Sequence, residues 1–153
     1  MDIIDIIYSK GVDYMKHNAE VIAKVINYIE EHLADELDLE KIASAAGYSK
    51  YHLHRMFAEG VGCTVHQYIQ KRRLTEAARQ LVHTDKPIIN IAFSAGYEAQ
   101  QSFTLAFKKL YLVSPQVYRK QKEFFPIQLK VQQVKGAYTS YIRMSNRCGV
   151  RAA

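Results

Sequence analysis

The sequence predicts an all-α fold in which a pair of helices is duplicated around one long helix. Apolar residues recur every three or four positions along most of the chain, the period of an amphipathic helix. The segment IASAAGY at 42–48 returns as IAFSAGY at 91–97, and each copy leads into a second amphipathic segment. Further on, Phe57 of the first copy matches Phe107 of the second. Because the copies share apolar positions but differ in polar ones, we expect function in the surfaces that differ.

The first three helices follow from apolar spacing and capping residues. The first helix is predicted to begin at an Asn18 cap and to bury this stripe: Ile22, Val25, Ile29 and Leu33. A short second helix over 39–46 should end at Gly47, since glycine can adopt the left-handed conformation of a sharp helix exit. A third helix, capped by Ser49, should bury Leu53, Met56 and Phe57.

The longest helix is predicted to open at Thr64, which forms a capping box with Gln67, and to run to about Val82. Its predicted buried face consists of Val65, Tyr68, Ile69, Leu74, Ala78 and Leu81. Pro87 then breaks and restarts the chain, and the second copy repeats the plan of the first. The last helix should begin at Ser114–Pro115 and carry Val117 and Tyr118 inward.

Beyond the last helix the pattern changes. Residues 127–131 alternate apolar and polar side chains, the period of a strand. The sequence therefore leaves two alternatives for the tail, a short β-strand or a disordered segment. The predicted organisation is an N-terminal extension (1–17), a first helical subdomain (18–63), a linking helix (64–83), a second helical subdomain (84–122) and a tail (123–153).

Composition narrows the function classes. At 153 residues, 48% of them hydrophobic, the chain suits one compact domain or two small subdomains rather than a large enzyme. No apolar run approaches the roughly 20 residues of a membrane span, and the acidic start lacks the basic residues of a signal peptide. We therefore expect a cytoplasmic protein with no membrane partner and with Cys63 and Cys148 as free thiols. The net charge of +6 favours a polyanionic partner.

Once its apolar stripe is buried, the third helix turns four neighbouring side chains outward: Lys50, Tyr51, His54 and Arg55. Two helices joined by a tight turn, the second with a protruding polar face, are typical of the helix-turn-helix motif whose second helix enters the major groove of DNA. Arg55 can donate to guanine O6 and N7, and His54 can donate to a purine or a phosphate. Tyr51 can stack on a sugar or contact a thymine methyl group.

The second copy presents a different outward face: Gln100, Gln101, Thr104 and Lys108, with Ser102 beside them. Glutamine can pair with both N6 and N7 of adenine, whereas the lysine suits a phosphate. The competing interpretation of either face is a merely solvated polar surface. Two such faces, each following a small-residue helix and a Gly-Tyr turn in a basic chain, favour DNA.

The sequence gives little support for a metal site or for catalysis. His52 and His54 do not face each other on a helix, so a metal site is disfavoured. No Ser/His/Asp or Cys/His set and no glycine-rich phosphate loop has a suitable spacing. We therefore expect neither an enzyme nor a cofactor. The tyrosines at matching repeat positions, among them Tyr48 and Tyr97, are interpreted as core or turn packing.

Several joint motifs resemble a known family: GYSKYHLHRMF at 47–57, Tyr68–Ile69 before Arg72–Arg73–Leu74, Gly96–Tyr97, Phe103, Phe107 and Ser114–Pro115 with Tyr118. Over about residues 18–122 the chain resembles the DNA-binding domain of the AraC/XylS transcriptional regulators, most closely their stand-alone and Rob-type stress activators. The resemblance implies about seven helices in two helix-turn-helix subdomains. It also implies sequence-specific binding to double-stranded DNA and activation through RNA polymerase.

By this resemblance, the base-reading residues are Tyr51, His54, Arg55, Gln100, Gln101, Ser102 and Thr104. The phosphate-contacting residues are Ser49, Lys50, Gln67 and Arg72, to which Lys108 is added from its charge. Position 105 departs from several relatives, which carry arginine there, because leucine cannot read guanine by hydrogen bonds. We therefore expect the second subdomain to depend more on thymine methyl contact, DNA shape and backbone contacts.

A linking helix of this length spans roughly 28 Å, close to the roughly 34 Å between successive major-groove faces of B-DNA. One molecule could thus read two adjacent grooves. Rob-type relatives carry an effector-binding domain after this region, so the tail is either its stub or a segment that docks back on the helices. We expect no small-molecule ligand in this chain. The alternative functions are a nonspecific architectural DNA binder and a helical protein-interaction module.

Overall fold

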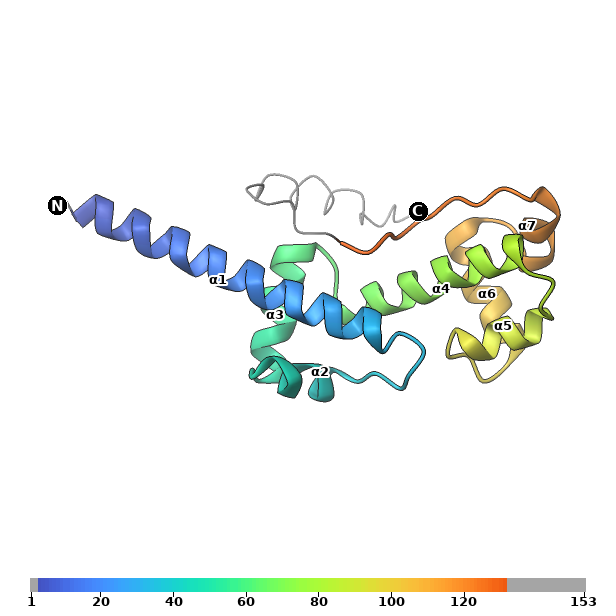
Figure 1. Cartoon of the computed structure of the whole chain (residues 1–153), viewed down its shortest axis with the longest axis horizontal. Coiled ribbons are helices and arrows are strands. Elements are labelled where there is room, and N and C mark those ends of the chain that lie inside the picture. The colour runs from blue at the N-terminus through green and yellow to red at the C-terminus, as the bar shows by residue number, and fades with distance from the viewer. Residues whose placement is uncertain (1–2, 132–153) are drawn as a thin grey trace. The chain divides into compact units, whose positions relative to one another are not determined.

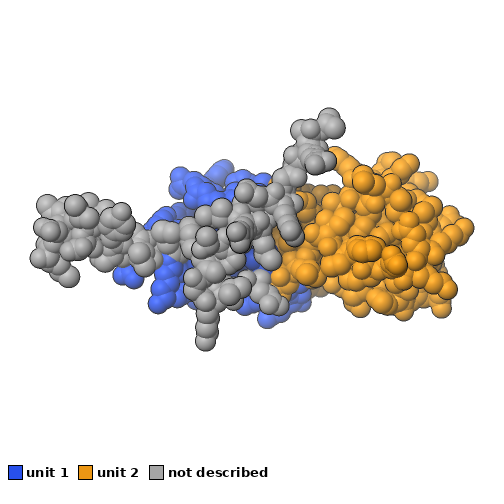
Figure 2. All heavy atoms as spheres, turned by 90° about the horizontal axis from the view of Figure 1, so that it is seen from above, with its two compact units in different colours: residues 1–31, 38–65, 131–153 blue, residues 32–37, 66–130 orange. Residues whose placement is uncertain are grey.

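The structure, a computed structural model, describes residues 3–131 and forms seven helices and no strand within that range (Figure 1). Their bounds are α1 Ile3–Glu31, α2 Leu39–Ala46, α3 Lys50–Val61, α4 Val65–His83, α5 Ile88–Ser94, α6 Gln100–Tyr111 and α7 Pro115–Gln121. The all-α prediction is confirmed. The helices belong to two compact units, shown in different colours in Figure 2. Unit 1 contains α1 to α3, and unit 2 contains α4 from His66 onward, α5 to α7, the 32–37 connection and the segment through Lys130.

Unit 1 is held together by the apolar faces of its three helices, each of which contacts the other two. The side chains buried on α1 include Val21, Ile22, Val25, Ile26 and Ile29. They share the core with Ile42 of α2 and with Leu53 and Phe57 of α3, and the last two have no exposed surface. The predicted stripes of these helices are confirmed, except that Leu33 is only partly buried and lies beyond the end of α1.

The start of α1 differs from the prediction. The helix begins at Ile3 rather than at Asn18, so Asn18 lies in mid-helix and is not a cap. The physical reason is that no proline interrupts residues 3–31, and Gly11 alone lowers helix propensity by about 1 kcal/mol, which a long helix tolerates.

Unit 2 has a core in which α4 supplies one wall and the second copy supplies the rest. Its buried members are Leu74, Ala77, Ala78, Leu81, Ile91, Ala92, Ala95, Phe103, Phe107 and Tyr118. Phe107 lies among aromatic rings, with ring centroids 5.6 Å from Phe103, 4.6 Å from Tyr111 and 5.4 Å from Tyr118. The predicted inward position of Val117 is wrong, because Val117 is 47% exposed. Pro115 and Tyr118, three residues apart, form the buried side of this short helix instead.

The two copies end their first helix in the same way. Gly47 and Gly96 both adopt positive φ angles, +77° and +82°. In each copy the following tyrosine donates its backbone N–H to the alanine carbonyl five residues earlier, at 2.9 Å for Tyr48 and 3.1 Å for Tyr97. This pattern is the Schellman motif, in which a left-handed residue closes the helix. The glycine prediction at Gly47 is therefore confirmed, and the repeat extends it to Gly96.

The two glycines differ in what surrounds them, which gives a matched stability test. A Cβ added at Gly47 meets nothing within 4 Å, whereas one at Gly96 would lie 2.7 Å from Nη1 of Arg73. That guanidinium donates to the carbonyl oxygens of Leu33, at 2.8 Å, and Asp35, at 2.5 Å, so it cannot move without losing these bonds. Gly47→Ala should cost about 1–2 kcal/mol from backbone strain alone, and Gly96→Ala about 1–2 kcal/mol more.

Urea denaturation followed by circular dichroism measures both costs. In an Arg73→Ala background the excess cost of Gly96→Ala should vanish, because the side chain that blocks the new Cβ is gone. Equal costs for the two glycine variants in the wild-type background would show that Arg73 does not restrict this turn.

The segment after α7 is not the predicted strand. Residues 127–131 do not form a strand, and the backbone of Gln128 bonds to side chains of α4 instead. The Gln128 backbone N–H donates to Thr75 Oγ1 at 3.1 Å, and the Gln128 carbonyl accepts from Arg72 Nη1 at 3.1 Å. Ile127 and Leu129 are 43% and 63% exposed, whereas Val131, the third apolar residue of the alternating pattern, is buried. Through Lys130 the tail thus docks back on unit 2, one of the two alternatives that the sequence left open.

Two smaller expectations concern the cysteines and the membrane. Among the described residues Cys63 is buried and forms no disulfide bond, whereas Cys148 lies outside them. Within residues 3–131, no helix combines the length and the apolar character that crossing a bilayer requires.

Candidate nucleic-acid interface

The face of α3 is fixed by its cap and its core contacts. Ser49 adopts extended backbone geometry, and its hydroxyl accepts a hydrogen bond from the His52 backbone N–H at 3.3 Å, which sets the first turn. With Leu53, Met56 and Phe57 buried, the opposite side turns to solvent. It carries the predicted set Tyr51, His54 and Arg55, all exposed, with Lys50 half-exposed. The structure therefore brings these four side chains together on one surface.

The cationic end of this surface is already engaged with an acid. Lys50 Nζ lies 2.9 Å from Glu40 Oε1 of α2, and this hydrogen bond, with the charge of Glu40, raises the pKa of the Lys50 ammonium. The same Nζ lies 5.5 Å from the ring centroid of Tyr51, which is 79% exposed. Because exposed ion pairs are weak and screened by solvent, Lys50 can exchange Glu40 for a phosphate.

The histidines at the turn of unit 1 have different surroundings. His52 stacks on Tyr48 with ring centroids 5.3 Å apart, and the Tyr48 hydroxyl lies 2.6 Å from His17 Nε2. His52 is thus part of the turn packing, while His54 stays on the exposed surface. In the described part of the chain no group of three or more potential metal ligands comes together. Packing is also the role of Tyr97, whose ring meets Phe103 edge-on at 5.6 Å.

The face of α6 follows from the burial of Phe103 and Phe107, neither of which has any exposed surface. The opposite side presents the predicted residues of the second copy: Gln100, Gln101, Ser102 and Lys108, all exposed, and Thr104, half-buried. Its first two turns carry hydroxyl and amide groups and no cation; Lys108 and Lys109 lie in the last turn. In contrast to α3, this surface offers neutral hydrogen-bonding groups at its amino end.

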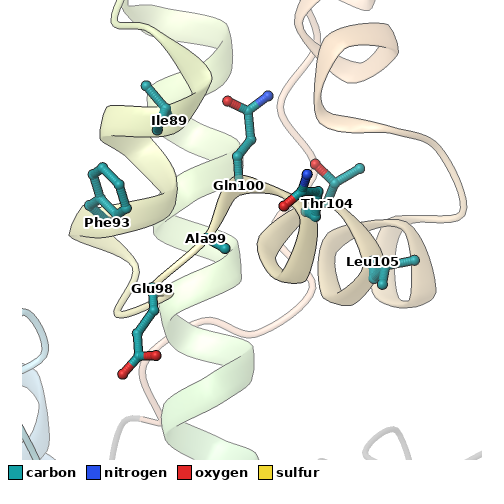
Figure 3. Close-up of a pocket in the computed structure, with 8 residues that line it drawn as sticks. Ile89, Phe93, Glu98, Ala99, Gln100, Thr104 and Leu105 are labelled. Carbon is teal, nitrogen blue, oxygen red and sulfur yellow. The ribbon is translucent and has the colours of Figure 1, made fainter.

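An open groove of about 800 Å³ lies between α5 and α6, beside these residues (Figure 3). Ile89 and Phe93 project into it from α5, and Gln100, Gln101, Thr104 and Leu105 line it from α6, with Glu98 and Ala99 in the turn. Three apolar side chains at its rim are well exposed, at 42% for Ile89, 52% for Phe93 and 71% for Leu105.

The sequence prediction missed Ile89 and Phe93. The repeat held the signal that finds them, because their counterparts in the first copy are Glu40 and Ser44, which are polar. An apolar residue that replaces a polar one at an exposed repeat position is not required by the shared core. Ile89 and Phe93 are therefore expected to act at the surface of unit 2 rather than in its core.

The remaining phosphate candidates lie on α4 and differ in exposure. Gln67 is exposed in its first turn. Arg72 is only 7% exposed, and its guanidinium donates to Glu76 Oε1 at 3.4–3.5 Å as well as to the Gln128 carbonyl. Arg72 therefore belongs to the interior of unit 2 in this structure. A phosphate could reach it only after the segment around Gln128 had moved away.

Comparison with known proteins agrees with this geometry. Residues 42–121 match the family model described as a helix-turn-helix domain. The multiple antibiotic resistance protein MarA of Escherichia coli is 40% identical over 102 residues, covering 67% of this chain and 80% of MarA. An uncharacterized HTH-type transcriptional regulator of Bacillus subtilis, YbfP, is 43% identical over 100 residues, covering 65% of this chain. The chain spans about a third of YbfP, since the match covers 34% of that protein.

Among solved structures, the DNA-binding domain of the global transcriptional factor AdpA, in complex with a target DNA, superposes with a TM-score of 0.62. It is 26% identical in sequence, and the match covers 65% of this chain and 90% of that domain. The matched part of this chain thus shares its fold with a domain whose structure was solved on DNA.

Proposed function

Because the chain belongs to the AraC/XylS family of helix-turn-helix transcriptional regulators, we propose that it binds double-stranded DNA of defined sequence and thereby regulates transcription. In this proposal α3 and α6 each enter a major groove, and the two grooves are adjacent. The observation that carries the proposal is that both helices bury a matched aromatic anchor, Phe57 or Phe107, and turn a row of hydrogen-bonding side chains to solvent.

In the α3 half of the interface the proposed readers are Tyr51, His54 and Arg55. The Arg55 guanidinium can donate two parallel hydrogen bonds to guanine O6 and N7, the commonest specific contact in the major groove. His54, one position earlier on the same face, donates to a purine or a phosphate. Ser49 and Lys50, at the amino end of the helix, suit the phosphates that fix its position.

In the α6 half the proposed readers are Gln100, Gln101, Ser102 and Thr104. An amide can pair with adenine N6 and N7, and the two hydroxyl groups can donate or accept at any base edge. Lys108 suits a phosphate at the far end of the helix, and Gln67 of α4 is proposed as a further phosphate contact. We assign no phosphate to Arg72 while Gln128 occupies its guanidinium.

The proposal extends to activation through contact with RNA polymerase, acting in the cytoplasm at the nucleoid. Transcription in vitro from a promoter that carries the binding site tests it. A rise in transcript that requires both the protein and the site supports activation, and a fall would assign repression instead.

Selection from random duplexes tests the DNA-binding proposal directly. The full chain should enrich a site with two half-sites about 10 base pairs apart centre to centre, the spacing of successive major grooves on one side of DNA. Its affinity for that site should exceed its affinity for random competitor DNA by at least about 10³-fold. A smaller ratio with no enriched sequence would identify a nonspecific architectural binder.

Arg55→Ala should weaken binding to the selected site by about 1–3 kcal/mol and relax the preference for guanine at one position. Lys50→Ala is the matched control from the preceding turn, because a phosphate contact is the same for all sequences and its loss should weaken every duplex about equally. Binding of each variant to a panel of single-base variants of the site measures both effects. An unchanged guanine preference in Arg55→Ala would show that α3 is not a reading helix.

A further inference from the structure

The groove between α5 and α6 differs in chemistry from the equivalent surface of unit 1. Repeat alignment pairs Ile89 with Glu40, Phe93 with Ser44 and Leu105 with Arg55. In unit 1 these positions include a carboxylate that is paired with Lys50 and an exposed guanidinium. In unit 2 all three are apolar and exposed (Figure 3). The same scaffold thus presents an ionic reading surface in one copy and an apolar one in the other.

The lining of the groove restricts what can occupy it. Its eight residues contain no lysine, arginine or histidine, and Glu98 is the one charged residue among them. A phosphate would meet a carboxylate and no cation, so the groove does not suit the DNA backbone. Leu105 has no donor for guanine O6 and N7, but Gln100 and Gln101 carry amides that match adenine.

Thymine is the base that presents an apolar group in the major groove, because its C5-methyl group projects there beside the O4 acceptor. We propose that this groove accepts thymine methyl groups, so that unit 2 recognises an A·T-rich half-site with Leu105 as its specificity-determining contact. Phe93 and Ile89 add apolar side chains to the lining of the groove from α5. The proposal rests on the proposed function and names the base chemistry of its second half-site.

Removal of single methyl groups tests the proposal. In the selected duplex, each thymine of both half-sites is replaced in turn by deoxyuridine, which keeps every hydrogen-bonding group and lacks only the methyl. The full chain should bind about fourfold more weakly at one or two replacements in the A·T-rich half-site, the effect of one buried methyl group. Leu105→Ala should bind the thymine duplex about as weakly and should no longer respond to these replacements.

Two controls separate this effect from general damage. Leu112→Ala removes a second exposed leucine, 81% exposed and outside the groove, and should keep the full sensitivity to deoxyuridine. Replacement of guanine by 7-deazaguanine in the other half-site should weaken wild type and Leu105→Ala by the same factor. Leu105→Arg should move the preference at the sensitive position from thymine to guanine.

The outcomes distinguish this inference from the proposed function. Failure of the random-duplex selection to enrich any site would remove the proposed function itself. A site that is enriched and bound specifically, but that tolerates every deoxyuridine replacement within about 1.5-fold, would overturn the thymine inference alone. So would Leu105→Ala and Phe93→Ser variants that bind the site like wild type but fail to activate transcription, since the groove would then dock a protein.

Discussion

Phe107→Ala is expected to lower the free energy of unfolding by about 3–5 kcal/mol, the range for truncation of a buried phenylalanine. Phe107 has no exposed surface, and its ring contacts Phe103, Tyr111 and Tyr118. Alanine would leave a cavity among three rings and would remove their edge and stacking contacts. A domain of this size has only about 5–15 kcal/mol of stability in total. Phe107→Ala should therefore also weaken the hold of unit 2 on DNA, and the second half-site should lose its protection against DNase.

Urea denaturation followed by circular dichroism measures the loss, and DNase footprinting on the selected duplex reports the half-site. For the denaturation measurement alone, Leu105→Ala is the matched control on the same helix, because an exposed leucine should change stability by less than about 0.5 kcal/mol. A cost below about 1 kcal/mol for Phe107→Ala would mean that the aromatic cluster does not hold α6 in place.

Raising salt from about 50 to 200 mM should weaken binding to the selected duplex by at least about 40-fold. The estimate follows from three cations on the proposed interface, Lys50, Arg55 and Lys108, because each neutralised phosphate adds about 0.9 to the slope of log affinity against log salt. Fluorescence anisotropy over a salt series gives that slope directly. Lys50→Ala should reduce it by about 1.

The salt series also tests the protein-interaction alternative. An apolar docking surface buries few charges, so its affinity should change by less than about threefold over the same range. A flat response for the bound duplex would contradict the groove-reading geometry even if binding itself were tight. A slope that stays unchanged in Lys50→Ala would show that Glu40 keeps this lysine from the DNA.

Local physics made much of the fold predictable. The Ser49 and Ser114 caps, the glycine that ends α2 and the buried phenylalanines all follow from rules that involve residues a few positions apart. For the same reason the outward faces of α3 and α6 were predictable, since burial of one side of a helix determines which residues lie on the other. That these faces bind DNA remains a proposal.

The features that the sequence did not predict depend on distant contacts or on competing local signals. Alternation over 127–131 does not reveal that Gln128 meets Thr75 and Arg72, residues more than 50 positions earlier. The family resemblance suggested that Arg72 contacts a phosphate, but an acid four residues later and a carbonyl from the tail hold its guanidinium inside. At the amino end, the cap preference of Asn18 was overridden by the uninterrupted helix around it.

The two copies share the turn tyrosine and the buried phenylalanines. Folding depends on these residues and not on the side chains at the exposed positions. A substitution at Arg55 or Leu105 changes an exposed side chain and leaves the buried framework intact, so its cost in stability is small. Under the proposed function, each unit could therefore acquire a new base preference by single mutations without first gaining stability elsewhere. In evolutionary terms, reading by two units as proposed would let one half of an operator drift while the other stays constant, and the protein would follow that drift with one unit at a time.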